Sequence, residues 1–391
     1  MVGELYDYMI GIVVVGIIFT SAVFTIPAMS NINLLQVNQQ QLRNTALNLF
    51  NAMLLGTGSP SDWGSTFPFD QNNVEAFGLD LSEDSSPYVL DTDKLQRLDQ
   101  ESPGYIEYSY VRDLLKLEEY GFDLSIFRPF TVDWDLRICD PSSSVCFAVN
   151  VTRSEDGRPI PNAQVSVTLL CAAKNPDKVD EPIVNITRPG TLFTDALGQT
   201  EGTQFIQVPP GYIIETAVAI LKITVAGIST MVVAQQDQTV QNVMKINTFG
   251  DTIILSFRGE LTNTSAVRRV LNIMTFNYDD TLTEVYGGGD GNEDKITEGY
   301  GYVFWNNTFP GLKAMDPALL LFLVSVPLGA GGGGRRPVMV AGPFSLWESS
   351  EVFSFGPDSP SVRDVEVKLR RYVLISGITY IAELTMWKEQ A

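Results

Sequence analysis

The sequence predicts a mainly β protein that opens with an N-terminal transmembrane and amphipathic α-helix. A small α+β region follows, and then antiparallel β-sandwich domains. Three observations predict this class. The chain carries no charged residue between Asp7 and Arg43, its apolar residues alternate with a period of two beyond about Val132, and 45% of its residues are hydrophobic against 18% charged. The charged share is below the usual value of about 25%, so the composition is that of an ordered protein with little solvated helix surface.

The predicted membrane helix is the segment MIGIVVVGIIFTSAVFTIPAM at 9–29. Its length matches the roughly twenty apolar residues that a bilayer helix needs. The segment has no polar face, which argues against a buried core helix. A cleaved secretory signal remains the alternative, although its flank should be basic and this one carries Glu4 and Asp7.

An amphipathic helix is expected to continue to Leu55, because apolar residues recur at helical spacings at Leu35, Leu42, Ala46, Leu49 and Met53. Pro27 should kink or interrupt the helix, and Gly56 should supply a left-handed cap at its end. We therefore expect residues 1–55 to form the anchoring and assembly element. The rest of the chain, from 57 on, is expected to fold without it.

Beyond Gly56 the pattern predicts three units. Residues 56–131 form the small α+β region, with a helix starting at 91–93 and another over 106–117. Residues 132–258 form one β-sandwich, and residues 259–391 form a C-terminal β domain. The apolar run at 217–234 is also a candidate second membrane span, but Lys222 and Gly227 interrupt it and its alternation favours paired strands.

Composition excludes several functions. The formal net charge of −20 repels phosphate backbones, so nucleic acid is not an expected partner. The chain has no histidine, which removes Ser-His-Asp and Cys-His nucleophile activation and the commonest zinc ligand. We predict no enzyme activity, no cofactor and no metal site. A weak calcium-loop pattern at Asp290, Asn292 and Asp294 lacks the glycine and the terminal glutamate of such loops.

The cysteines and sequons favour an oxidising, extracellular compartment. Cys139 and Cys146 bracket a turn-rich hairpin tip, so a cross-strand disulfide is the preferred pairing. The alternative is three reduced thiols, with Cys171 packed as a small hydrophobe. Four N-x-Ser/Thr sequons are glycosylation candidates: Asn150, Asn185, Asn263 and Asn306.

The first 130 residues resemble archaeal members of the type IV pilin superfamily. The resemblance rests on the polar start MVGELYD, the uncharged helix with Pro27, and the motifs LLGTGSPSDWG, FGLDL and YVLDTDKLQRL. It implies a helix that holds the subunit in the membrane and packs into a filament core after processing by a dedicated peptidase. The processing site would lie between Gly3 and Glu4, although Val2 stands where the family usually has a basic residue.

A second resemblance covers 147–258. The segments VTRSEDGRPIPNAQVSVTL and TDALGQTEG are similar to carboxypeptidase-regulatory-like and bacterial immunoglobulin-like sandwiches. Asp156-Gly157 should make a turn, and Ala163 and Val165 should point into the core. The resemblance implies a spacer or adhesive module.

Together these observations predict a non-enzymatic cell-surface structural protein. It would be a single-pass, pilin-like subunit that displays extracellular β domains for filament assembly or adhesion. Its expected partners are membrane lipid and like subunits, which contact its N-terminal helix in a homo-oligomer or filament. The alternative is a permanently membrane-anchored binding module for a polysaccharide or an envelope-layer ligand, using exposed aromatics such as Trp305 or Trp347. Ordinary packing inside a sandwich is the other, favoured interpretation of both tryptophans. Any ligand is unknown from the sequence.

Overall fold

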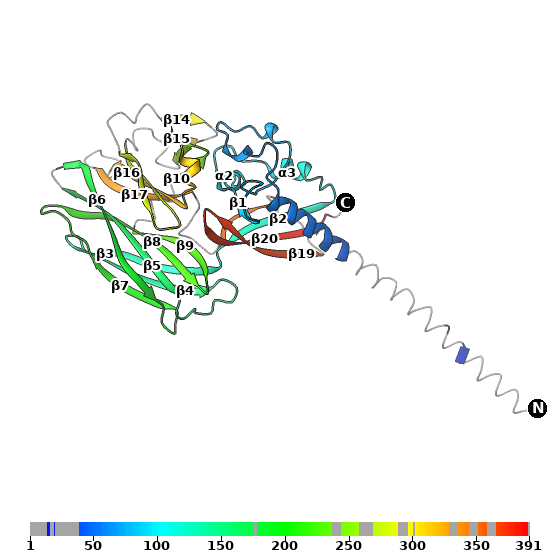
Figure 1. Cartoon of the computed structure of the whole chain (residues 1–391), viewed down its shortest axis with the longest axis horizontal. Coiled ribbons are helices and arrows are strands. Elements are labelled where there is room, and N and C mark those ends of the chain that lie inside the picture. Colours follow the sequence, from blue (N-terminus) through cyan, green and yellow to red (C-terminus); the bar gives the residue numbers. More distant parts are fainter. Residues whose placement is uncertain are drawn as a thin grey trace, which may run out of the picture.

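A computed structural model of the chain describes residues 14–15, 19, 39–175, 178–236, 244–257, 269–287, 296–299, 302–327, 335–343, 351–357 and 365–389. These residues form mainly antiparallel strands in several sheets, with short helices between them (Figure 1). The mainly β class is therefore confirmed. No helix within these ranges is both long and apolar enough to cross a bilayer. The predicted span at 9–29 lies outside the described residues except for Val14, Val15 and Phe19.

One five-stranded sheet combines strands from the first third of the chain with strands from its C-terminal part. Its strands, in spatial order, are β1 (Val89–Leu90), β19 (Glu366–Ile375), β20 (Ile378–Lys388), β2 (Tyr120–Phe127) and β18 (Glu351–Phe355). Only β1 runs parallel to its neighbour; the other pairs are antiparallel. β19 and β20 lie within the range 259–391 predicted for the C-terminal domain, yet they pair with β1 and β2 of the 56–131 region.

A helix over 39–55 packs into the same core as this sheet (Figure 1). Its buried side chains, Leu42, Ala46, Leu49, Phe50, Met53 and Leu54, recur on one face at helical spacing. They share a cluster with Phe122, Leu384 and Met386 of the sheet. Full burial of each large apolar side chain contributes about 1.5–3 kcal/mol. This helix therefore supplies part of the core, whereas the sequence predicts that the chain after Gly56 folds without it.

The helix ends where predicted, but not by the expected cap. Gly56 N donates to Ala52 O at 3.1 Å, and its φ is not positive. A Cβ at Gly56 would lie 2.6 Å from Ala52 O, so close packing explains this glycine. The left-handed conformation occurs two residues later, at Gly58, where φ is 77°.

A β-sandwich follows along the chain. One sheet contains β3 (Phe130–Asp140), β4 (Ser144–Arg153) and β7 (Gln199–Phe205), and the other contains β6 (Lys178–Phe193), β5 (Gln164–Asn175), β8 (Ile213–Val225) and β9 (Ile228–Gln235). Their inward side chains form one cluster that includes Ala163 and Val165, both 0% exposed. Gly157 takes a φ of 68° in the turn, as expected. The 217–234 segment is the β8–β9 hairpin, not a membrane span.

A second layered unit occupies 244–342. One sheet has β10 (Met244–Phe249), β11 (Thr252–Phe257), β15 (Tyr302–Thr308) and β14 (Ile296–Gly299); the other has β13 (Leu282–Gly287), β12 (Arg269–Phe276), β16 (Leu319–Pro327) and β17 (Arg335–Gly342). The two sheets share a core that contains Leu255, Trp305 and Phe322. β10 and β11 fall inside the range 132–258 predicted for the first sandwich, and they pair and pack within this second unit.

Candidate functional site

The N-terminal helical residues within the described part of the chain are apolar and exposed. Val14, Val15 and Phe19 are helical and 48%, 66% and 71% exposed. This contrasts with the 39–55 helix, whose apolar face is covered by the body. Exposed apolar side chains of this kind are unfavourable in water.

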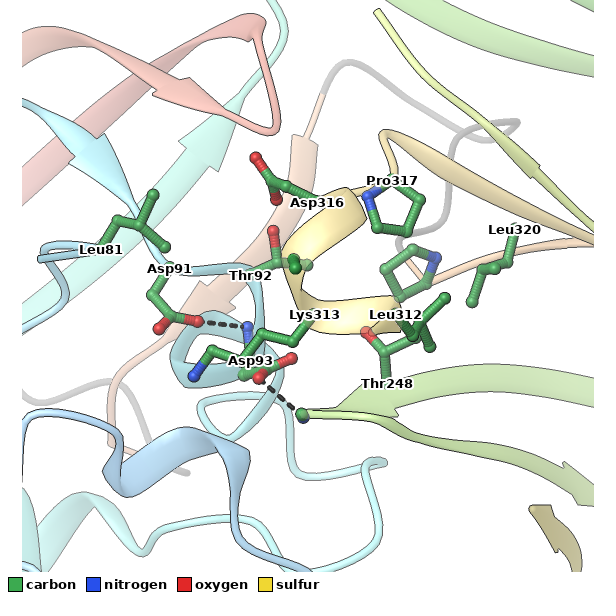
Figure 2. A pocket seen from close by; sticks show the side chains of 13 residues that line it. Leu81, Asp91, Thr92, Asp93, Thr248, Leu312, Lys313, Asp316, Pro317 and Leu320 are labelled. Atoms are coloured by element: carbon green, nitrogen blue, oxygen red, sulfur yellow. Dashed lines mark hydrogen bonds between the residues drawn. The ribbon is translucent and has the colours of Figure 1, made fainter. Parts of the chain in front are cut away.

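A second candidate site is a cavity of about 230 Å³ where three short helical segments meet the sheets (Figure 2). It is lined by residues of α2 (Thr92–Gln96), α5 (Leu312–Met315) and the turn between β10 and β11, and η1 (Trp63–Ser65) reaches it through the contact of Ser65 with Asp93. Its walls combine the apolar side chains of Leu81, Leu312 and Leu320 with charged groups. Mixed concave surfaces of this kind are typical of small-molecule sites.

Asp93 is the centre of the polar contacts at this cavity. Its Oδ2 accepts hydrogen bonds from Ser65 Oγ at 2.6 Å and from Gly250 N at 2.8 Å. Lys313 Nζ in turn donates to Ser65 Oγ at 2.5 Å. Burial raises the pKa of Asp93 to about 6, helped by the negative charge of Asp91 and opposed by these hydrogen bonds and by Lys313.

Asp91 holds the start of α2. Its Oδ1 accepts from Asp93 N at 2.8 Å and from Lys94 N at 3.4 Å, which is an N-cap arrangement. Burial raises the pKa of Asp91, while the ammonium of Lys94, 4.0 Å from its Oδ2, opposes the rise. Lys94 is itself fully buried, and its Nζ donates to the carbonyls of Thr57 and Asp80. Burial lowers the pKa of Lys94.

The other face of α2 contacts β10. Gln96 exchanges hydrogen bonds with Thr248, and Asn247 Nδ2 donates to Gln96 Oε1 at 3.2 Å. The guanidinium of Arg97 donates to four backbone carbonyls and lies 3.4 Å from the centroid of the Phe249 ring. These contacts fix the position of α2 and hence of Asp93.

Sequence reasoning did not find this cavity. It placed a helix start at 91–93, which the structure bears out, and quoted the YVLDTDKLQRL motif only for its resemblance. Asp91, Asp93 and Lys94 lie close together at the start of a short helix, and this local pattern indicates an N-cap. The lysine that completes the cluster, Lys313, lies 248 residues from Ser65 along the chain.

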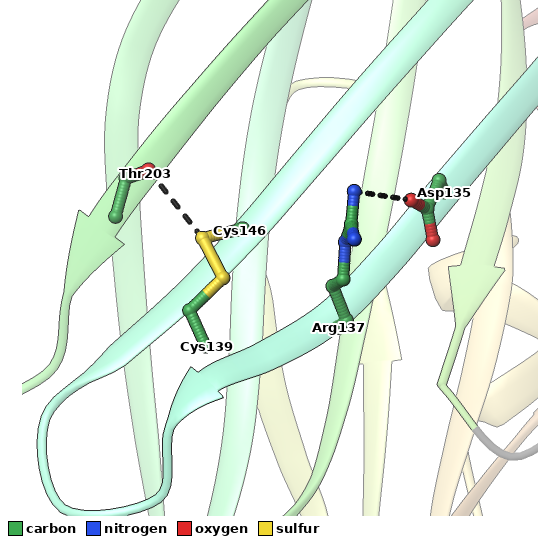
Figure 3. Close-up of a disulfide and its surroundings, with 5 residues drawn as sticks. All are labelled: Asp135, Arg137, Cys139, Cys146 and Thr203. Carbon is green, nitrogen blue, oxygen red and sulfur yellow. Dashed lines mark hydrogen bonds and ion pairs between the residues drawn. A yellow bond between two sulfur atoms is a disulfide. The ribbon is translucent and has the colours of Figure 1, made fainter.

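The structure joins Cys139 and Cys146 in a disulfide across the β3–β4 hairpin (Figure 3). Their Cα atoms are 5.8 Å apart, inside the distance of about 7 Å that a disulfide allows. Thr203 of the neighbouring strand β7 lies 3.4 Å from Cys146 Sγ. Cys171 is a buried free thiol, whose pKa burial raises to about 12. The structure therefore has the pairing that the sequence favours, with Cys171 as the unpaired cysteine.

The three described sequon asparagines all lie within strands. Asn150 is half-buried in β4, with its amide 3.5 Å from the Asp133 carboxylate. Asn185 and Asn306 are half-buried in β6 and β15. Asn263 lies outside the described residues.

The remaining predicted positions are placed as follows. Trp305 is only 2% exposed and lies 5.9 Å from Phe322, ring to ring, so the suggestion that it is an exposed ligand-binding aromatic is wrong. Trp347, Gly3, Glu4 and the calcium-loop pattern at 290–294 lie outside the described residues. Within the described ranges, no group of three or more His, Cys, Asp or Glu side chains is placed to hold a metal ion.

Comparisons with known proteins add little. No protein-family model matches the chain, and no curated protein matches it. Among solved structures, the sporulation control protein Spo0M from Bacillus subtilis is 12% identical, covering 55% of this chain and 90% of its own, with a TM-score of 0.17. MtrC from Shewanella baltica OS185 is 6% identical, covering 56% and 71%, with a TM-score of 0.16. Likenesses this weak carry no argument about fold or function.

Proposed function

We propose that this protein is a non-enzymatic, pilin-like subunit of the cell surface. Its N-terminal helix holds the chain in the membrane or packs against like helices, and its β body is displayed outside the cell. The pilin resemblance of the first 130 residues motivates the proposal. The protein's partners are then membrane lipid and other copies of itself, and the sandwich serves as a spacer or adhesive module.

The observation that carries the proposal is the contrast along the N-terminal helical residues. The 39–55 helix buries its apolar face against the five-stranded sheet, whereas Val14, Val15 and Phe19 are helical, apolar and exposed. The chain has no charge between Asp7 and Arg43 that could solvate the exposed part. Apolar helix surface of this kind requires lipid or another helix around it. The disulfide of the β3–β4 hairpin suits an oxidising compartment outside the cytoplasm.

The first experiment is N-terminal sequencing of the native protein after fractionation into membrane and sheared surface material. A filament subunit is expected to begin at Glu4 and to occur in the sheared fraction. A chain that begins at Met1 and stays in the membrane indicates the alternative, a permanently anchored binding module. A native chain that begins after Phe19 and is soluble without detergent would overturn both.

A matched pair of substitutions tests the helix itself. Val15→Glu puts a charge into the exposed apolar part, which is unfavourable in lipid by about 2–3 kcal/mol at mid-bilayer. We expect this variant to be depleted from membranes and from sheared surface material. Asn48→Glu puts the same charge on the exposed side of the 39–55 helix and should partition as the unmodified protein does.

A further inference from the structure

The Asp93 carboxylate connects three segments that are distant in sequence. It belongs to α2, accepts from Ser65 of η1 and from Gly250 of the β10–β11 turn, and reaches Lys313 of α5 through the Ser65 hydroxyl. Both direct hydrogen bonds end on the same oxygen, Oδ2. The carboxylate is therefore the common acceptor that holds the contacts at one side of the cavity together (Figure 2).

Lys313 is the movable member of this chain of contacts. The residue is exposed, whereas the α5 backbone is held separately: Gly311 N and Lys313 N both donate to the Asp251 carboxylate. Ser376 Oγ donates to Asp316 at 2.8 Å at the other end of α5. The Lys313 side chain can thus leave Ser65 without displacing the helix that carries it.

The other charged groups on the elements packed around Asp93 do not take over its role as the acceptor of the Ser65 hydroxyl. They are Asp91, Lys94 and Arg97 on or beside α2, Asp62 beside η1, Lys245 on β10, Asp251 in the β10–β11 turn, and Lys313 and Asp316 on or beside α5. Arg97 is engaged with four backbone carbonyls, and Lys245 is paired with Asp99. Asp91 is engaged in capping α2, and Lys94 is engaged with backbone carbonyls. Asp316 and Asp251 are engaged in the contacts of α5. Asp93 is the anion to which the Ser65 hydroxyl, and through it the Lys313 ammonium, is linked.

We propose that Asp93 is a proton-operated clasp on this cavity, closed over Ser65, Gly250 and Lys313 when the carboxylate is ionised and open when it is protonated. A proton from solvent, which reaches Asp93 through the cavity, removes the negative charge. Hydrogen bonds to a neutral acceptor are about half as strong as those to a carboxylate. Ser65 then holds the Lys313 ammonium less well, and the lysine moves into water.

The change should fall in the mildly acidic range. Burial and the neighbouring Asp91 charge raise the pKa of Asp93 to about 6. At the cell surface, a location that rests on the proposed function, this clasp would let the contact between α2 and the 244–342 unit respond to external acidity. The clasp itself needs only Asp93, Ser65, the Gly250 amide and Lys313.

The test uses the full chain in detergent between pH 5 and 7.5. The first measurement is hydrogen exchange of the Gly250 amide, corrected for its intrinsic rate. The second is the rate of reductive methylation of Lys313 divided by that of Lys388, which is an exposed lysine. The general pH dependence of lysine methylation cancels in this ratio. On acidification we expect Gly250 protection to fall and the Lys313 ratio to rise, each by about threefold or more, with midpoints near pH 6.

Three variants separate the roles. Asp93→Asn should give a high Lys313 ratio that does not change with pH. Ser65→Ala should also release Lys313 at every pH, yet keep the pH dependence at Gly250, because Asp93 still titrates. Glu83→Gln, which removes a carboxylate from an exposed loop, should behave as the unmodified protein does. A Lys313 ratio in the unmodified protein that is flat across this range, or unchanged by Ser65→Ala, would overturn the proposal even where Asp93→Asn fails to fold.

Discussion

Gln96 and Thr248 satisfy each other's hydrogen bonds across 152 residues of sequence. Gln96 Nε2 donates to Thr248 O at 3.1 Å and to its Oγ1 at 2.9 Å, while Thr248 N donates to Gln96 Oε1 at 2.8 Å. Gln96 is 2% and Thr248 7% exposed. Because the donors and acceptors are buried, each would be costly to leave without a partner. The pair therefore fixes α2 against β10, and with it the cavity that contains Asp93.

The first prediction concerns this pair. Gln96→Leu keeps the volume but leaves the Thr248 amide without its acceptor and removes one of the two acceptors of Asn247 Nδ2, the other being Ser102 Oγ. We therefore expect a loss of about 2–4 kcal/mol in the free energy of unfolding. Chemical denaturation of the full chain in detergent measures it. Gln207→Leu, at an exposed position, is the control and should change stability by less than about 0.5 kcal/mol. Equal losses in both variants would show that the buried pair has no special role.

Truncation tests whether the 39–55 helix is needed for the rest of the chain to fold. A fragment of residues 39–391 retains the helix that covers the five-stranded sheet, whereas 57–391 lacks the core side chains of Leu42, Leu49, Phe50 and Met53. We expect 39–391 to be folded and soluble without detergent, and 57–391 to aggregate or to lose near-ultraviolet circular dichroism. Two fragments of equal thermal stability would show that the helix is dispensable for the body.

The sequence predicted this helix but not what covers it. Apolar residues at helical spacing define a face, and lipid, a like helix and the chain's own sheet would all select the same pattern. The pattern therefore assigned the whole of 1–55 to anchoring. The structure divides it, because Phe50 and Met53 lie in the same core cluster as Leu384 and Met386 from the far end of the chain.

Strands were predictable from alternation, but their partners were not. The period of two locates β2 and β19, along which burial largely alternates, whereas β20 is buried on both faces over 382–387. Nothing local indicates that β2 pairs with β20 across more than 200 residues, as Leu124 does with Leu384. Local hairpins are different: the turn between Cys139 and Cys146 defines its own pairing, and the hairpin was found correctly.

A third prediction concerns the disulfide. Cys139→Ser together with Cys146→Ser removes a crosslink that closes a loop with a sequence separation of 7. Loop closure of that length accounts for about 2–3 kcal/mol of stability. Thermal unfolding with and without reductant measures the loss. Cys171→Ala removes the buried free thiol instead, and this variant should still respond to reductant. A double variant as stable as the oxidised protein would count against a structural role for the crosslink.

The last prediction is the effect of Asp93 on stability as a function of pH. The pKa of this carboxyl is raised from 3.8 to about 6 by burial and by the charge of Asp91. The folded state therefore binds the proton more tightly than the unfolded state does. The stability that Asp93 contributes is fully present below about pH 3.8, and it is lost as the pH rises through 6.

A shift of that size corresponds to about 3 kcal/mol between pH 7.5 and pH 3.5. Because other carboxyl groups titrate in the same range, the quantity to measure is the difference in unfolding free energy between the unmodified protein and Asp93→Asn. We expect this difference to move by about 3 kcal/mol in favour of the unmodified protein on acidification, with most of the change between pH 6 and 4. The same difference taken against Glu83→Gln should stay small, because that residue is exposed. A difference from Asp93→Asn that is independent of pH would show that Asp93 titrates alike in the folded and unfolded chain.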